Sequence, residues 1–179
     1  MTVPKPSDTK QRILDVAREL FTSQGVQRTS LQDIAGRLGI TKPALYYHFP
    51  SRDDLVRSIV QPMLDDGEQF LLAQEARGDA PVRELIEGFF DFNYRHRADV
   101  IMLLAEMPTL ADLGLIDKAL GWRTRLTTLI CGPSPTLEQQ ARAILALGGL
   151  QDVCMQFPDA PVEDLKAAAV AGALDALGG

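Results

Sequence analysis

Residues 38–49 constrain the fold of this chain more than any other stretch, and they read Leu-Gly-Ile-Thr-Lys-Pro-Ala-Leu-Tyr-Tyr-His-Phe. Gly39 can adopt the positive φ with which many helices end. Thr41 can cap a following helix with its hydroxyl, and Pro43 then lies in the first turn, where a missing N–H does no harm. Because so short a helix is marginal alone, other helices must hold it. The stretch therefore predicts a helix-turn-helix whose second helix faces a DNA major groove.

Helical periodicity continues along the rest of the chain, and no alternating strand pattern appears. Apolar stripes, caps and breakers predict about nine helices. Their expected positions are 8–24, 31–38, a third from 42, a fourth from 51, 82–97, 99–107, one within 110–130, 136–157 and 162–177. We therefore expect an all-α protein with two domains, a helix-turn-helix domain over residues 1–54 and a helical domain over residues 55–179.

The charge of the chain is unevenly distributed, although its net value is −6. Residues 1–60 carry nine Lys and Arg against six Asp and Glu, a net of +3, and the remaining residues carry a net of −9. A basic N-terminal part can meet phosphates while an acidic body stays away from them. An ordinary solvated charge pattern is the alternative explanation.

Several classes of protein are disfavoured by composition. The apolar runs are too short for a membrane span, and the N-terminus lacks the apolar core of a secretion signal, so we expect a cytoplasmic protein. Two histidines and two cysteines without a CxxC pair make a zinc site improbable, and no metal or cofactor is expected. The sequence shows no pair of a nucleophile and a base that would indicate an enzyme. Cys131 and Cys154 are expected to be packing residues, and oxidant sensing by either is the open alternative.

A longer pattern runs from Ser30 to Leu55, in which Ala35, Gly39, Tyr46, Phe49 and Leu55 fall in one register. With Ser30-Leu-Gln-Asp-Ile-Ala, Leu38-Gly-Ile, Lys42-Pro-Ala-Leu-Tyr-Tyr-His-Phe and Ser51-Arg-Asp-Asp-Leu, it resembles the N-terminal domain of TetR-family transcriptional regulators. The resemblance is close over the first third of the chain, and the rest matches only in helical layout. It implies a homodimer whose third helices lie in major grooves and whose C-terminal bodies bind a small-molecule inducer.

The predicted recognition helix supplies most of the candidate DNA contacts. Lys42 begins this helix and can donate to guanine or to a phosphate. Pro43 and Ala44 offer small apolar surfaces suited to a thymine methyl group. The hydroxyls of Tyr46 and Tyr47 can reach phosphate oxygens, and in the family the positions of Tyr46 and His48 commonly contact the DNA backbone. Packing between helices is the alternative role for Tyr46 and for His48.

The start of the second helix and the turn after Phe49 complete the candidate surface. Thr29 and Ser30 are expected to offer a free hydroxyl and N–H groups to an anion, and Gln32 to reach a base or a phosphate. Arg52 stands where the family most often has lysine, and a guanidinium can hold a phosphate with two N–H groups. The candidate DNA-binding residues are Thr29, Ser30, Gln32, Lys42, Pro43, Ala44, Tyr46, Tyr47, His48 and Arg52.

The last two predicted helices are rich in small and aliphatic residues that surround more than one stripe. A helix of this kind is buried on two sides, against its own core and against a second chain. With the resemblance, this predicts a homodimer through these helices; a purely intrachain core is the alternative. An apolar ligand cavity could be lined by Phe89, Phe92, Met102, Met107, Trp122, Leu126, Met155 and Phe157. Residues of these types are also common in an ordinary core.

These observations favour a ligand-responsive repressor that binds a palindromic DNA operator as a dimer and is released by a small apolar or amphipathic ligand. The alternative is a regulator without a small-molecule inducer, controlled by a protein partner or acting as an activator.

Overall fold

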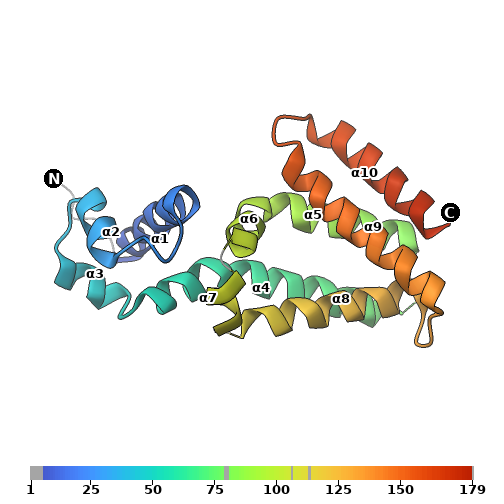
Figure 1. Cartoon of the computed structure of the whole chain (residues 1–179), viewed down its shortest axis with the longest axis horizontal. Coiled ribbons are helices and arrows are strands. Elements are labelled where there is room, and N and C mark those ends of the chain that lie inside the picture. Colours follow the sequence, from blue (N-terminus) through green and yellow to red (C-terminus); the bar gives the residue numbers. More distant parts are fainter. Residues whose placement is uncertain (1–5, 79–80, 106, 113, 179) are drawn as a thin grey trace. The chain divides into compact units, whose positions relative to one another are not determined.

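The computed structural model describes residues 6–78, 81–105, 107–112 and 114–178, and all the regular secondary structure of this part is helical (Figure 1). The helices are α1 (Pro6–Gln24), α2 (Leu31–Leu38), α3 (Lys42–His48), α4 (Arg52–Arg77), α5 (Val82–Arg95), α6 (Arg97–Ala105), α7 (Met107–Asp112), α8 (Leu115–Cys131), α9 (Leu137–Gln156) and α10 (Val162–Leu177). The predicted all-α class is confirmed.

The sequence predicted two helices between residues 99 and 130, and the described residues of this segment lie in α6, α7 and α8. Glu106, between α6 and α7, lies outside the described residues, and Pro108 is the second residue of α7. Gly114 then takes a left-handed conformation, with φ of 69°, immediately before α8. A left-handed residue cannot continue a right-handed helix, so α7 and α8 are separate.

The chain divides into two compact units, residues 1–62 with 101–113 and residues 63–100 with 114–179. Helix α4 begins in the first unit and ends in the second. The domain boundary predicted after residue 54 stays a prediction.

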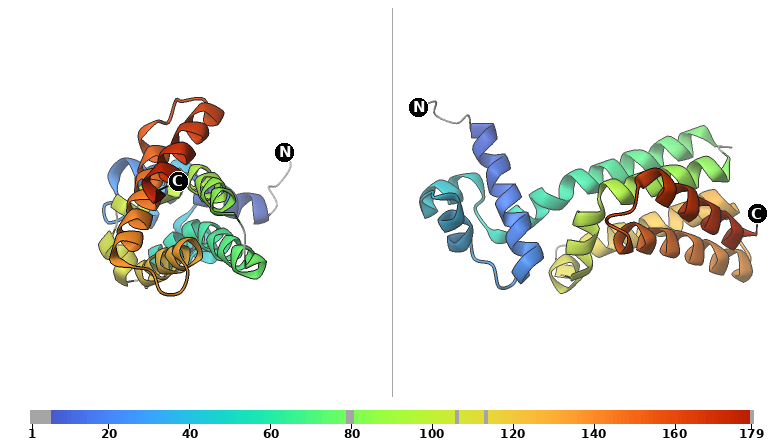
Figure 2. Two further views of the ribbon diagram at one scale, coloured as in Figure 1. Left: turned by 90° about the vertical axis from the view of Figure 1, so that its right-hand side faces the viewer. Right: turned by 90° about the horizontal axis from the view of Figure 1, so that it is seen from above.

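Helices α1, α2 and α3 lie together in the first unit (Figure 2). Their buried apolar residues form a common core. Apolar residues that recur at helical spacing face inward, as the sequence pattern predicts. The core residues of this part are Ile13, Ala17 and Phe21 in α1, Ile34 and Ala35 in α2, Leu45 in α3, and Val26 and Phe49 beside them. Leu38, the last residue of α2, is only partly buried. The core fixes which face of α3 turns outward.

The second unit is a helical bundle in which α9 packs against α5, α8 and α10 (Figure 1). Its buried cluster includes Ile86 and Phe90 of α5, Leu147 and Leu150 of α9 and Val170 of α10. Trp122 of α8 lies so close to Gly67 of α4 that a Cβ there would overlap the indole ring. No helix of the described residues is long and apolar enough to cross a membrane.

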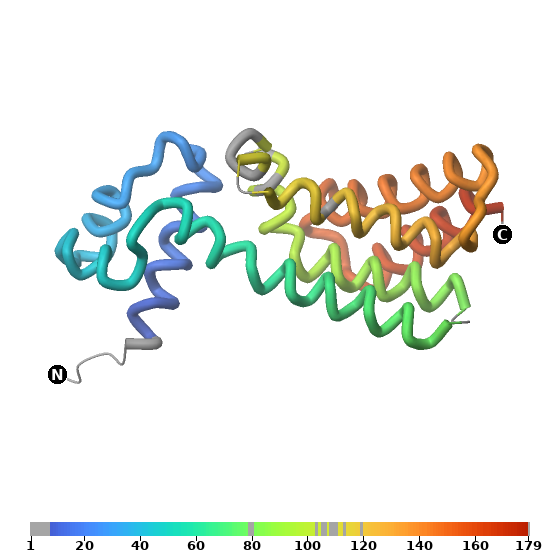
Figure 3. The backbone as a smooth tube through the Cα atoms, turned by 90° about the horizontal axis from the view of Figure 1, so that it is seen from below, coloured from blue at the N-terminus to red at the C-terminus, as the bar shows by residue number. Residues whose placement is uncertain are grey.

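Polar bonds hold the second half of α4 against α8, and the two helices run side by side in Figure 3. Arg125 donates to both carboxylate oxygens of Glu75 at 2.7 Å and to Glu68 at 2.7 Å. The Trp122 indole N–H donates to the other oxygen of Glu68 at 2.9 Å. Hydrogen bonds from Arg125 and then from Trp122 lower the pKa of Glu68, because they stabilise its charged form.

Candidate DNA-binding surface and apolar groove

The turn between α2 and α3 has the geometry that the sequence predicts. Gly39 is left-handed, with φ of 67°, and its N–H donates to Ala35 and Gly36 carbonyl oxygens at the end of α2. Thr41 is extended and caps α3, since its hydroxyl accepts from the Ala44 N–H at 3.3 Å. Pro43 lies in the first turn of α3. These contacts fix the direction in which α3 leaves the turn.

The two sides of α3 differ sharply in exposure. Leu45 is fully buried and Phe49, just after the helix, is 2% exposed, so this side anchors α3 to the core. Tyr46 is 41% exposed and Tyr47 83% exposed. Lys42, Pro43 and Ala44 are also exposed. The structure therefore leaves the predicted recognition face open.

Aromatic contacts organise this open face. The Lys42 ammonium lies over the Tyr46 ring, 5.7 Å from its centroid, which is the geometry of a cation–π contact. The Tyr47 ring meets the His48 ring edge-on, with centroids 5.3 Å apart. His48 is only half-buried. Both tyrosines thus keep their hydroxyls on side chains that are largely accessible, and Lys42 adds a positive charge beside them.

The N-terminus of α2 corrects part of the sequence-based prediction. Thr29 is 1% exposed, and its hydroxyl donates to the Gly25 carbonyl at 2.8 Å and accepts from Gln24 at 3.1 Å. The prediction of a free Thr29 hydroxyl is therefore wrong, because the side chain closes the turn before α2. The N–H groups of Leu31 and Gln32, the first two residues of α2, are then the groups that could face an anion.

Ser30 forms a capping box with Asp33. Its hydroxyl accepts from the Asp33 N–H at 3.1 Å and donates to the Asp33 carboxylate at 2.8 Å, and its own N–H donates to the same carboxylate at 2.8 Å. The Ser30 hydroxyl is thus engaged, contrary to our expectation. The backbone and side-chain hydrogen bonds from Ser30 lower the pKa of Asp33. Ser30 consequently fixes the start of α2. Its contribution to DNA binding would then be to hold the N-terminus of α2 in place.

A groove joins the start of α2 to α3 and to the start of α4. It brings together six of the ten predicted residues, Thr29, Ser30, Gln32, Lys42, Tyr46 and Arg52, and it adds Leu31, Pro50, Ser51 and Asp53. The other four predicted residues, Pro43, Ala44, Tyr47 and His48, do not line it. Ser51 was not among the predicted surface residues, because a serine just before a helix is most simply explained as its cap. The Ser51 hydroxyl does accept from the Asp54 N–H at 3.0 Å.

Arg52 is held by protein groups. Its Nη1 lies 3.4 Å from the carbonyl oxygens of Val26 and Gln27, and its Nη2 donates to the Gln27 side-chain oxygen at 3.2 Å. The side chain is partly buried, and its Nε has no hydrogen-bond partner in the described residues. The guanidinium that was predicted to hold a phosphate therefore donates from both terminal nitrogens to the turn between α1 and α2.

Sequence comparison assigns this unit. Residues 13–59, which include the whole helix-turn-helix, match the family model described as bacterial regulatory proteins, tetR family. The helix-turn-helix domain of this chain belongs to the TetR family. The HTH-type transcriptional regulator AcrR of Shigella flexneri is 47% identical over 58 residues, 32% of this chain and 27% of that protein. Among the first curated relatives the match spans only about a quarter to two fifths of their length.

Solved structures share the fold of this chain over most of its length. AmtR of Mycobacterium smegmatis superposes with a TM-score of 0.76, covering 99% of this chain and 90% of that chain at 22% identity. The SmeT–triclosan complex superposes with a TM-score of 0.68, covering 94% of this chain and 91% of that chain at 23% identity. At these identities the likeness establishes the fold.

The predicted ligand-lining residues are divided between the two units of the chain. Four belong to one region of the second unit: Phe92 stands edge-on to Trp122, with centroids 6.1 Å apart, and Phe89 and Leu126 pack on the same buried core. Met155 is half-buried in α9. Met102, which is buried, and Met107, which is 44% exposed, belong to the first unit. The ligand cavity stays a prediction.

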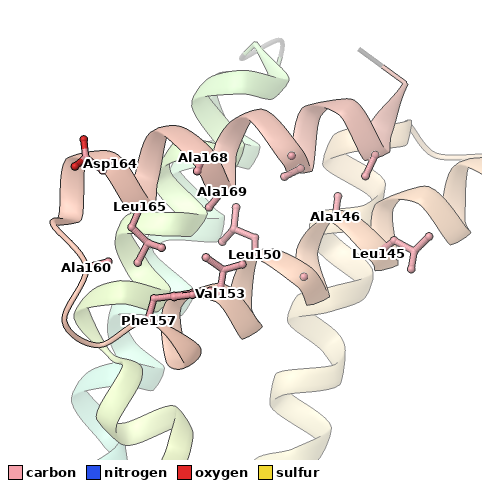
Figure 4. A pocket seen from close by; sticks show the side chains of 14 residues that line it. Leu145, Ala146, Leu150, Val153, Phe157, Ala160, Asp164, Leu165, Ala168 and Ala169 are labelled. Atoms are coloured by element: carbon pink, nitrogen blue, oxygen red, sulfur yellow. The ribbon is translucent and has the colours of Figure 1, made fainter.

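An apolar groove of about 550 Å³ runs between α9 and α10 (Figure 4). Leu150 and Val153 from α9 and Leu165 from α10 project into the space between the two helices. Small residues form much of the α10 side, and Phe157, the eighth predicted ligand-lining residue, lies at one end. Leu145 is 68% exposed and Phe157 is 53% exposed, so large apolar side chains face outward here.

The two cysteines are weak nucleophiles in this environment. Cys154 is fully buried, and burial raises the pKa of its thiol to about 11. Cys131 is half-buried, and burial also raises the pKa of its thiol. Since the thiolate is the reactive form, both positions disfavour reaction with an oxidant.

Proposed function

We propose that this chain is a DNA-binding transcriptional regulator that reads its operator with α3. The observation that carries the proposal is the division of α3 into a buried side at Leu45 and an open side bearing Lys42, Tyr46 and Tyr47. A helix held in this way can enter a major groove without losing its packing. The phosphates would meet the N-terminus of α2 and the positive charge near it, which the net charge of +3 over residues 1–60 favours.

The regulator would act as a homodimer through α9 and α10. The apolar groove between these helices and the exposed Leu145 and Phe157 support this, because contiguous apolar surface marks an interaction site. Alanine and glycine on α10 would let a second pair of helices approach closely. A two-fold dimer would place its α3 helices about one DNA turn apart (~34 Å), so a palindromic operator is expected.

Control by a small molecule is the third part of the proposal, with repression as the expected direction. The SmeT–triclosan complex supports it, because SmeT shares the fold of this chain and is bound to a small molecule, triclosan. In this chain, the aromatic cluster around Phe92 and Trp122 is the candidate ligand region. Helix α4 begins at Arg52, which lines the groove at the starts of α2 and α3. The same helix carries Glu68, which is bonded to Arg125 of α8. Helix α4 would therefore transmit the ligand signal. A coupling free energy of ~1–3 kcal/mol would suffice.

Fluorescence-polarisation titration of the full chain on its own upstream DNA, over a salt series, tests the DNA-binding part. A sequence-dependent complex whose log K falls linearly with log salt is expected, with scrambled DNA of equal length as the control. Binding no tighter than to the scrambled duplex would argue against autoregulation, and selection from random duplexes would then decide whether any operator exists. A reporter assay on the bound DNA would distinguish repression from activation.

A further inference from the structure

The contacts of Arg52 differ from those expected of a DNA ligand. Its side chain crosses from the first residue of α4 to the turn between α1 and α2, a separation of 25 and 26 residues in sequence. Three acceptors converge on two guanidinium nitrogens, the Val26 and Gln27 carbonyls on Nη1 and the Gln27 side chain on Nη2. A guanidinium is a rigid fork, and a fork whose terminal nitrogens are engaged in this way is poorly placed for a bidentate phosphate contact.

The same turn is connected to the start of α2 by further bonds. The Val26 carbonyl that Arg52 holds also accepts from the Thr29 N–H at 3.2 Å. The Thr29 hydroxyl then donates to the Gly25 carbonyl, and Ser30, the next residue, caps α2. One continuous series of contacts thus links the first residue of α4 to the N-terminus of α2.

We infer that Arg52 is a positioning residue, which holds the α1–α2 turn and thereby places the N-terminus of α2 for DNA, and that it is not itself a phosphate ligand. The inference deepens the proposed function and rests on it for the DNA part only. Lysine at this position would keep the charge but would present a single compact ammonium, which cannot reproduce the fork that bridges two backbone carbonyls and a side chain. Arginine at this position is therefore needed for geometry as well as for charge.

Amide hydrogen exchange of the full chain without DNA tests the positioning role by itself. The Arg52→Ala and Arg52→Lys variants should each exchange the Thr29 amide about tenfold faster than the unmodified protein, because the turn loses charge-assisted bonds. Gln27→Ala removes one acceptor only and should give a smaller increase. Arg57→Ala, which deletes an exposed cation one turn further along α4, is the matched control and should leave Thr29 unchanged. Unchanged Thr29 exchange in Arg52→Ala and Gln27→Ala would overturn the inference.

The salt dependence of DNA binding separates positioning from phosphate contact. Arg52→Lys should lose affinity about as much as Arg52→Ala, roughly tenfold, and neither should change the slope of log K against log salt. A direct phosphate contact predicts the opposite result: Arg52→Lys would keep its affinity, and Arg52→Ala would reduce the slope by about 0.9. If the unmodified protein binds no DNA in this way, the proposed function fails, whereas the exchange experiment still decides whether Arg52 holds the turn.

Discussion

Replacing Tyr47 by alanine should separate DNA binding from folding. The Tyr47 side chain is 83% exposed, so about a sixth of its surface is covered, which is about 35 Å² for an aromatic side chain of roughly 200 Å². At about 25 cal/mol per Å², the substitution should lower the free energy of unfolding by less than about 1 kcal/mol. Leu45, two residues away on the same helix, is fully buried, and Leu45→Ala should cost about 2–5 kcal/mol.

The same substitution should have a large effect on DNA binding, in contrast to its small effect on stability. A Tyr47 hydroxyl that donates to a charged phosphate oxygen contributes about 1.5–3 kcal/mol, so its loss should weaken operator binding by about 10- to 150-fold for each protomer. Fluorescence polarisation measures the affinity, and urea unfolding of the same samples measures stability. Lys42→Ala, which removes another exposed side chain of α3, should weaken binding with a similarly small effect on folding.

The reasoning would be refuted if Tyr47→Ala and Lys42→Ala bound the operator as tightly as the unmodified protein. The open face of α3 would then not be the reading surface. A large loss of stability in Tyr47→Ala would instead contradict the burial on which the separation depends.

Three other outcomes are expected. Gly39→Ala should lower the free energy of unfolding by about 1–2 kcal/mol in urea titration, because φ is 67° although no atom lies within 4 Å of the added Cβ; an unchanged midpoint would mean that the turn relaxes. Leu145→Glu should shift the protein from dimer to monomer in sedimentation velocity, since a charge would enter an apolar interface, and a dimer that persisted would place the interface elsewhere. Bonds from Arg125 and Trp122 lower the pKa of Glu68, so their contribution to stability is present above its ordinary pKa of 4.5 and is lost as pH falls through the lowered value. Glu68→Gln should therefore flatten the fall of stability in this acidic range, which thermal melts at a series of pH values would measure, and an unchanged acid profile would show that the bonds are worth little.

The helix-turn-helix was predictable because its signals are local. Gly39 needs a left-handed backbone, Thr41 and Ser30 need an adjacent N–H to accept from, and both requirements involve residues within three positions along the chain. The spacing of Leu45 and Phe49 likewise determined which side of α3 would be buried, and hence which side would be open. The boundary between the last two helices before residue 131 was less certain, because a glycine such as Gly114 inside an apolar run is also compatible with a continuous helix.

What the side chains do in three dimensions could not be read from the sequence. Thr29 and Arg52 look like polar surface residues in any local window, yet Thr29 is buried in a turn and Arg52 reaches a turn 25 residues earlier in the chain. Aromatic residues such as Phe92 and Trp122 were compatible with a ligand cavity and with an ordinary core. The apolar character of a side chain does not specify whether a ligand or another side chain packs against it. Short-range backbone interactions, which the sequence specifies directly, determined the helix-turn-helix. Tertiary packing decided the direction of each long polar side chain, because its partners come from distant parts of the chain.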